Sequence, residues 1–138
     1  MALRALYLAS LAYLGERELI RNEITELGWN AELETYTQIF GGDTVDASLF
    51  FLAIYNFEDA SSARMRRTYQ RIRGKLAPRA GLVNRNEESR TSGEGAFAVC
   101  SFWEVDFLAQ GGGNLEEDRQ HVVEGAERSQ CPRAAACA

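Results

Sequence analysis

Apolar residues in this chain recur at the three- and four-residue spacing of α-helices, in segments of roughly 11 to 15 residues. Little of the sequence shows the alternation that is typical of strands. The pattern predicts helices over residues 1–14, 16–27, 44–55, 62–76 and 97–109. Short helices joined by short connections favour an all-α fold made of antiparallel helix pairs.

Capping and breaking residues set the expected helix boundaries. Gly15 divides the first two helices, and Gly28 can take the left-handed conformation that follows a helix. Asp43 is the expected N-cap of the next helix, with Asp46 three residues later, and Pro78 follows the fourth helix. The remaining segments are expected to be connections: residues 29–42, irregular or briefly extended; 80–90, a loop; and 111–113, a glycine linker before a last helix capped by Asn114.

The helix over residues 62–76 is expected to bury one apolar stripe, made of Met65, Tyr69, Ile72 and Leu76. Five arginines fall largely on its other faces: Arg64, Arg66, Arg67, Arg71 and Arg73. We interpret this cluster as a solvated surface, with a ligand-binding patch as the alternative.

Charge and hydropathy exclude several classes of function. The net charge of −5 and the pI near 5.0 argue against a nucleic-acid partner, because phosphate binding needs a basic face. The helical spacing of apolar residues in 1–14 favours a core helix over a secretory signal, and the apolar run 49–55 is shorter than the about 20 residues that span a bilayer. We therefore expect no membrane segment and a cytoplasmic location.

The cysteines and the single histidine carry no recognisable site. Cys100 lies inside an apolar helix, whereas Cys131 and Cys137 lie in the tail, and the spacing is not that of a disulfide framework. Cys100 is interpreted as a small buried residue, and His121 lacks partners for metal or nucleophile chemistry. We expect neither a metal nor a cofactor.

One carboxylate stands out by its position. Glu94 lies between Gly93 and Gly95, directly before the apolar segment 97–109, so that a glycine turn presents it next to a helix. An acid at the beginning of a helix complements the helix dipole and stabilises it by about 0.3–1 kcal/mol. A rigidly held carboxylate facing a cleft is the alternative interpretation.

Three ordered blocks extend this observation. The first joins Gly28-Trp29-Asn30 and Tyr36-Thr37-Gln38 to the run Gly41-Gly42-Asp43-Thr44-Val45-Asp46-Ala47-Ser48-Leu49; the second is Gly81-Leu82-Val83-Asn84-Arg85; the third is Gly93-Glu94-Gly95-Ala96-Phe97 with Cys100-Ser101-Phe102-Trp103. In order and spacing, these blocks resemble glycoside hydrolase family 15, the glucoamylases, glucodextranases and trehalases. The resemblance covers residues 1–117, a minor part of a full catalytic domain.

The resemblance implies a partial α/α toroid, a fragment of a six-hairpin barrel, and inverting hydrolysis of an α-glucosidic bond in oligosaccharides or trehalose. That reaction needs two carboxylates about 6.5–9.5 Å apart, one protonating the leaving oxygen and one activating water. Carried over to this chain, the general base is Glu94. The family's general-acid block has no counterpart here, which implies a fragment that is inactive alone.

Other residues are candidates for supporting roles in binding the sugar. Trp29 and Tyr36 lie in the connection after the second helix, where aromatic faces can stack on an oligosaccharide or disaccharide, with packing in the core as the competing interpretation. Asp46 is a candidate to position the catalytic residue without touching the sugar itself.

The tail departs from the family pattern. Residues 1–117 are expected to form the partial catalytic domain, and residues 118–138 are low in complexity and typical of a disordered tail. We hypothesise that the reading frame or the gene is broken near residue 118, which translation of the downstream DNA in all frames would test.

Three functional hypotheses follow. The first is an incomplete family 15 α-glycosidase domain. The second is a non-catalytic helical fragment, or a sugar-binding or interaction module, and the third is a different α/α toroid. Half a toroid exposes helix faces that are otherwise covered, so self-association through those faces is expected.

Overall fold

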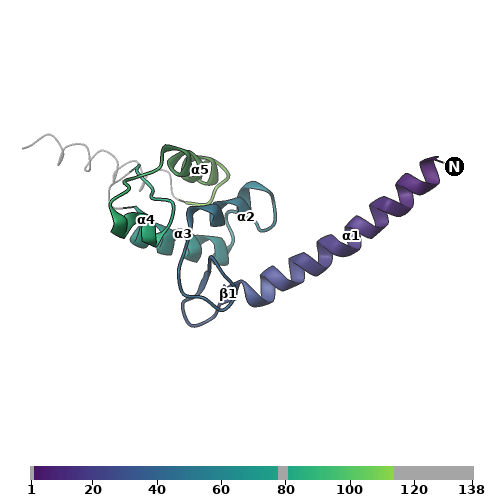
Figure 1. The fold of residues 1–138 in the computed structure, drawn as a ribbon, viewed down its shortest axis with the longest axis horizontal. Helices are drawn as coiled ribbons and strands as arrows, with labels where there is room; N and C mark the ends of the chain where they lie inside the picture. The colour runs from purple at the N-terminus through teal and green to yellow at the C-terminus, as the bar shows by residue number, and fades with distance from the viewer. Residues whose placement is uncertain (1, 78–80, 114–138) are drawn as a thin grey trace, which may run out of the picture.

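The chain folds into a helical body from which its first helix extends (Figure 1). This computed structural model describes residues 2–77 and 81–113, and within them the side chains from residue 13 onward. The elements in chain order are α1 (Ala2–Leu27), β1 (Trp29–Asn30), β2 (Thr35–Tyr36), the 3-10 helix η1 (Ala47–Phe50), α2 (Phe51–Ile54), α3 (Ala63–Leu76), α4 (Glu87–Ser92) and α5 (Ala98–Ala109). The described structure is mostly helical, consistent with an all-α class.

Three aromatic rings form the centre of the core. Phe107 of α5 lies 5.4 Å from Phe50 of η1 and 5.2 Å from Tyr69 of α3, measured between ring centroids. Aromatic pairs at such distances contribute about 0.5–1.5 kcal/mol beyond the area that they bury. The cluster therefore joins three elements that are far apart in sequence.

Helix α3 agrees with the sequence pattern. Ser62 caps its N-terminus by accepting a hydrogen bond from the Met65 amide at 3.1 Å. The predicted stripe is buried throughout, at Met65, Tyr69, Ile72 and Leu76. The prediction of this helix and of its core-facing side is confirmed.

A buried ion pair joins α3 to α5. Glu104, only 3% exposed, accepts a hydrogen bond from Arg73 Nη1 at 3.0 Å and faces the hydroxyl of Tyr69 at 3.4 Å. A carboxylate inside an apolar helix is tolerated because its charge is compensated by a partner within hydrogen-bonding distance.

The expected break at Gly15 is wrong, because α1 runs unbroken from Ala2 to Leu27. A glycine inside a helix costs only about 1 kcal/mol relative to alanine, which the surrounding helix formers offset. Helix α1 ends before Gly28, as predicted, but Gly28 is not left-handed. It continues the helical hydrogen bonding to the Ile24 carbonyl, which a Cβ at Gly28 would approach to 2.6 Å.

The expected helix over residues 44–55 begins later and as a different type. Asp46, not Asp43, is the N-cap, and its carboxylate accepts a hydrogen bond from the Ser48 amide at 2.7 Å. One turn of 3-10 helix then leads into the single turn of α2. The expected loop over residues 80–90 also contains the beginning of α4, which Asn86 caps.

The glycines after α5 form a packed turn where the sequence predicts a linker. Gly112 is buried, its amide donates to the Phe107 carbonyl at 3.1 Å, and a Cβ there would lie 2.1 Å from the Phe107 ring. Glycine is therefore required for the chain to cross over this core ring.

Several predictions concern residues outside the described ranges. These are Pro78, Asn114 and the helix after it, His121, Cys131, Cys137 and the tail 118–138. Within the described ranges, none of the helices combines the length and the apolar character that crossing a bilayer requires.

Because Glu104 is buried, we expect the loss of its charge to destabilise the protein more than the loss of an exposed charge does. We expect Glu104→Gln to lower the free energy of unfolding by about 2 kcal/mol, because it removes a buried charge partner of Arg73. Glu34→Gln is the matched control, since its 2.6 Å pair with Arg67 has both side chains 56% exposed and is worth below about 1 kcal/mol. Urea denaturation measures both, and equal losses would contradict the assignment.

Candidate active site

The segment between α3 and α4 binds the beginning of η1 and its N-cap through its backbone. The Ala47 amide donates to the Arg85 carbonyl at 2.8 Å, and Asp46 and Asn86 form an isolated antiparallel bridge. The first and second sequence blocks therefore lie side by side.

The same segment also binds the beginning of α5. The Phe97 amide donates to the Val83 carbonyl at 2.9 Å, and the Val83 amide donates to Ser101 Oγ at 3.1 Å. The second block thus joins the first, at Ala47, to the third, at Phe97, and Glu94 lies in the loop that enters this junction.

Two left-handed glycines set the conformation of the Glu94 loop. Gly93 has φ 78° and ends α4, and Gly95 has φ 84°. The Glu94 amide donates to the Ser89 carbonyl at 3.2 Å, and the cap of α5 is Phe97. Glu94 therefore directly follows the C-terminus of α4 and lies outside the first turn of α5, so the expectation of an acid at the beginning of a helix is wrong.

Arg85 is the charged neighbour of Glu94. Arg85 Nη2 lies 3.7 Å from Glu94 Oε2, and both side chains are more than half exposed. The carboxylate is thus open to water while a cation lies on one side of it. The sequence did not predict this partner. Its one signal was that Arg85 is the last residue of the second block.

Asp46 lies on the buried side of the same junction. Asp46 is 9% exposed. Its negative charge and the positive charge of Arg85 both affect the pKa of the buried Cys100 thiol. Burial, followed by the negative charge of Asp46, raises the pKa of the Cys100 thiol, while Arg85 opposes that shift. Asp46 and Arg85 are therefore brought together, and the Cys100 thiol is buried as predicted.

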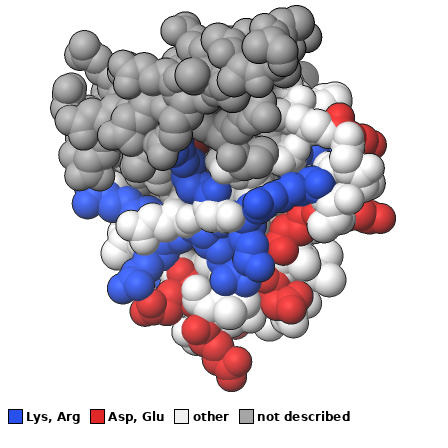
Figure 2. Space-filling model, turned by 90° about the vertical axis from the view of Figure 1, so that its left-hand side faces the viewer, with Lys and Arg blue, Asp and Glu red and all other residues white. Residues whose placement is uncertain are grey.

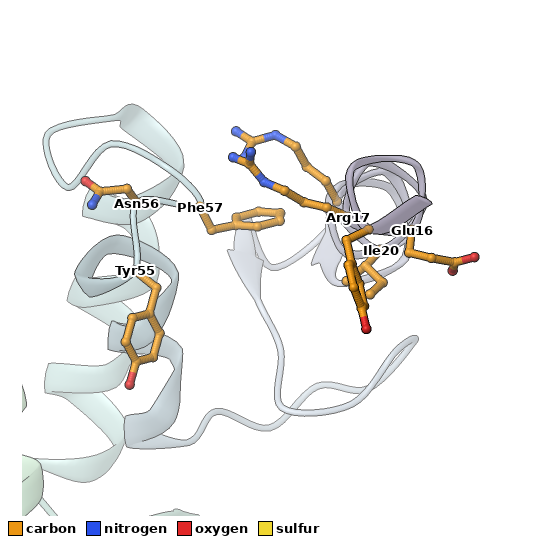
Figure 3. A pocket seen from close by; sticks show the side chains of 8 residues that line it. Glu16, Arg17, Ile20, Tyr55, Asn56 and Phe57 are labelled. Atoms are coloured by element: carbon orange, nitrogen blue, oxygen red, sulfur yellow. The ribbon is translucent and has the colours of Figure 1, made fainter. Parts of the chain in front are cut away.

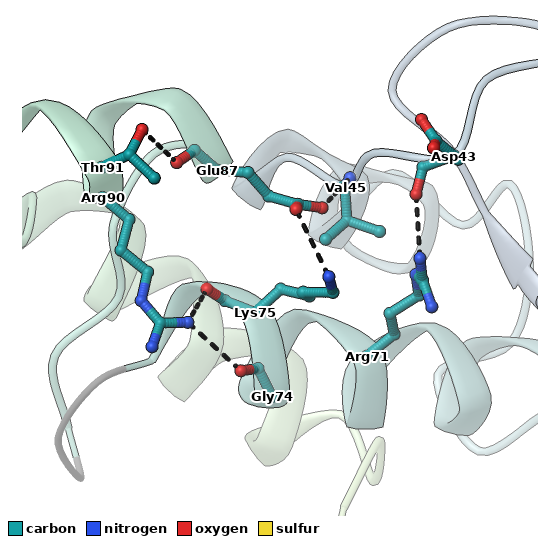
Figure 4. A network of polar contacts seen from close by, with 8 residues as sticks. All are labelled: Asp43, Val45, Arg71, Gly74, Lys75, Glu87, Arg90 and Thr91. Atoms are coloured by element: carbon teal, nitrogen blue, oxygen red, sulfur yellow. Dashed lines mark hydrogen bonds and ion pairs between the residues drawn. The ribbon is translucent and has the colours of Figure 1, made fainter.

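A polar network fixes α4, and with it the Glu94 loop, to the rest of the body (Figure 4). Glu87 accepts a hydrogen bond from the Val45 amide at 3.2 Å and pairs with Lys75 Nζ at 3.6 Å. Arg90 donates to the carbonyls of Lys75 and Gly74 at the end of α3. Both ends of α4 are thus tied to the end of α3, and its first residue is also tied to the segment before η1.

Lys and Arg side chains gather on the face at the left of Figure 1, as Figure 2 shows. Several of the α3 arginines hold contacts within the chain: Arg67 pairs with Glu34, and Arg71 donates to the Asp43 carbonyl at 2.9 Å. These contacts give the arginine cluster a structural role in addition to that of a solvated surface.

Trp29 and Tyr36 lie on the β1–β2 hairpin, in a different part of the chain from the Glu94 loop. Their rings meet edge to face at 5.2 Å, and the Arg64 guanidinium lies 4.8 Å above the Trp29 ring. The Tyr36 hydroxyl donates to Glu58 and accepts from Arg64. Tyr36 is 1% exposed but borders an apolar groove of about 360 Å³ between α1 and α2, so core packing describes most of its surface.

Burial and the hydrogen bond to Glu58 raise the pKa of Tyr36 to about 12. The described residues contain no cluster of three or more histidine, cysteine or acidic side chains arranged to hold a metal ion.

Comparisons with known proteins find similarity to parts of trehalases. The chain is 29% identical over 96 residues to the Thermoplasma acidophilum trehalase, covering 68% of this chain and 16% of that protein. It is 37% identical over 79 residues to the Mycolicibacterium smegmatis trehalase, covering 54% and 12%, and 32% identical over 96 residues to the Mycobacterium tuberculosis trehalase, covering 66% and 14%. No family model and no solved structure matches the chain.

The chain thus matches less than a fifth of the length of these relatives. Their similarity supports a relationship to glycosidases of the trehalase type.

The raised pKa of Tyr36 predicts a loss of stability at high pH. A folded-state pKa of about 12, above the unfolded value near 10, stabilises the fold below pH 10, and this stabilisation is lost between about pH 10 and 12. We expect Tyr36→Phe to remove about 1–2 kcal/mol of this pH dependence in urea denaturation. Tyr55→Phe, at a 75% exposed ring, is the control that leaves the profile unchanged.

The left-handed backbone at Gly93 predicts that alanine is unfavourable there although space is open around it. We expect Gly93→Ala to lower the free energy of unfolding by about 1–2 kcal/mol. Gly74→Ala has the opposite sign, stabilising by about 0.5–1 kcal/mol, because Gly74 lies in α3 with open space and no positive φ. Thermal unfolding of both variants checks the two signs, and a stabilising Gly93→Ala would contradict the expectation.

Proposed function

We propose that this chain is part of an inverting α-glycosidase of the trehalase and glucoamylase type, with Glu94 as its general base. The observation that carries this proposal is that the second sequence block contacts the first at Ala47 and the third at Phe97, while its Arg85 lies 3.7 Å from the exposed Glu94 carboxylate. Partial similarity to trehalases supports trehalose as the substrate, with other α-glucosidic oligosaccharides as further members of the same class.

In the proposed reaction, a water oxygen attacks the anomeric carbon from the face opposite the leaving sugar. Glu94 accepts one proton of that water, and a separate carboxylic acid gives its proton to the leaving glycosidic oxygen. The glycine-bounded loop and the contact of α4 with α3 would hold the base in position as charge develops.

Arg85 and Asp46 have supporting roles in this proposal. Arg85 Nη2, 3.7 Å from Glu94 Oε2, places a positive charge beside the proposed base. Asp46 fixes the backbone that carries Arg85, because it caps η1 and bridges to Asn86.

The second carboxylate would come from polypeptide outside the described residues. Two buried or half-buried acids near the junction already have other partners. Asp46 accepts a hydrogen bond from the Ser48 amide. Glu87 accepts one from the Val45 amide and forms an ion pair with Lys75. Because the sequence has no counterpart of the family's general-acid block, we expect the 138-residue chain alone to leave trehalose and maltose unhydrolysed.

The proposal also includes the fold of the complete domain, an α/α toroid of which this chain is a part. Helix α5 has one side in the core and exposes Phe102 and Val105 on another, with Phe97 exposed before its first turn. An apolar surface of this kind is suited to a further helix of a hairpin barrel. We propose that α5 packs on such a helix in the complete domain.

A chimaera tests the role of Glu94. The matching segment of the Mycolicibacterium smegmatis trehalase is replaced by that of this chain, and trehalose hydrolysis is measured. We expect the chimaera to be active and its Glu94→Gln variant to lose about 10²- to 10⁴-fold in kcat, the usual contribution of a general base. Glu88→Gln, an exposed acid on the neighbouring α4, is the matched control and retains activity.

Azide separates a chemical role of Glu94 from a structural one. As an anionic nucleophile, azide needs no base, so it should restore turnover to the Glu94→Gln chimaera and yield β-glucosyl azide. Full activity of Glu94→Gln without azide would refute the assignment.

A further inference from the structure

Helix α1 presents an apolar face that the rest of the described chain leaves open. It extends away from the body (Figure 1), and its described half exposes Tyr13 to 77% and Ile20 to 55%. Apolar side chains exposed in series along one helix are typical of a surface that another helix covers.

The pattern on this face is complementary to its own reverse. Tyr13, Glu16, Arg17 and Ile20 follow the i, i+3, i+4, i+7 spacing and share one side of α1, which we call the pairing face. It consists of an apolar residue, an acid, a base and an apolar residue. An identical helix running antiparallel, centred between residues 16 and 17, would place Tyr13 against Ile20 and Glu16 against Arg17 of the second copy.

The charges on the pairing face are available for such a partner. Among the described residues, neither Glu16 nor Arg17 forms an ion pair within the chain. Arg17 also stands one turn before Arg21, a like-charge i,i+4 pair that destabilises an isolated helix. A carboxylate from an antiparallel copy would lie beside Arg17 and relieve this repulsion.

The pairing face forms one wall of a groove (Figure 3). It has a volume of about 390 Å³, and Tyr55, Asn56 and Phe57 form the wall opposite α1. Arg21 lies 4.8 Å above the Phe57 ring, which holds α1 beside that wall. Glu16 points away from the wall in Figure 3, so the pairing face continues past the groove into solvent.

We propose that α1 pairs antiparallel with α1 of a second copy of this chain, through reciprocal Tyr13–Ile20 and Glu16–Arg17 contacts. The interface is isologous, so every contact occurs twice about the two-fold axis. Centring the pair between residues 16 and 17 sets residues 13–20 of α1 against the same residues of the second copy, about two turns, because Ile24 on the same side of α1 packs against the core. This inference does not depend on the proposed glycosidase function.

Reciprocal charge reversal tests the register. The full 138-residue chain is expected to sediment as a dimer at micromolar concentration. Glu16→Arg and Arg17→Glu should each raise the dissociation constant of the dimer about 4- to 30-fold, because two ion pairs change from attraction to repulsion. An equimolar mixture of the two variants should form a heterodimer as tight as the wild type, since each arginine then meets a glutamate.

Two further variants complete the experiment. Glu18→Arg, on the opposite side of α1, is the control for net charge and should change the dissociation constant less than twofold, as ~0.4 kcal/mol would. Ile20→Asp should abolish the dimer, with circular dichroism showing an intact fold. A monomeric wild-type chain, or a variant mixture no tighter than its separate components, would overturn the inference.

Discussion

The extended segment between α3 and α4 is the connection on which the rest of the structure depends. Its successive residues bind three different elements. The Val83 carbonyl accepts a hydrogen bond at the N-cap of α5, the buried Asn84 donates to the Leu76 carbonyl at the end of α3, and the Arg85 carbonyl accepts a hydrogen bond from the first residue of η1. An unpaired buried polar group costs about 1–3 kcal/mol, so these bonds leave little freedom in how the segments align. The aromatic core and the Glu94 loop both rest on that alignment.

Sequence reasoning succeeded where one apolar face decides the structure. The stripe from Met65 to Leu76 predicted α3 because each of its residues packs in the core. It failed where tertiary contacts choose between local alternatives. Asp43 and Asp46 are both suitable caps, and the bridge from Asp46 to Asn86 selects the second. Gly15 could break a helix or lie within one, and a cost of about 1 kcal/mol does not decide between them.

At the candidate site, too, the sequence predicted local conformation but not tertiary contacts. The Gly-Glu-Gly run predicted a glycine turn around Glu94, and both glycines are left-handed. The position of Arg85 could not be predicted, because it depends on α4 folding between the two residues. Helix α4 has six residues, too few for a periodic pattern to reveal, and it is held by contacts of Glu87 and Arg90 with distant segments. The sequence thus predicted the conformation around the acid but not its charged neighbour.

The position of Glu94 indicates whether stability alone explains an acidic residue there. Local electrostatics would explain it if the carboxylate lay in the first turn of α5, but it follows the C-terminus of α4, where the helix dipole disfavours a negative charge. The exposed contact with Arg85 offsets this by at most about 1 kcal/mol, as for other surface ion pairs. Stability alone therefore gives little reason for a glutamate between two left-handed glycines. A carboxylate that is open to water, on a loop that is hydrogen-bonded to α4, fits the proposed role of a water-activating base.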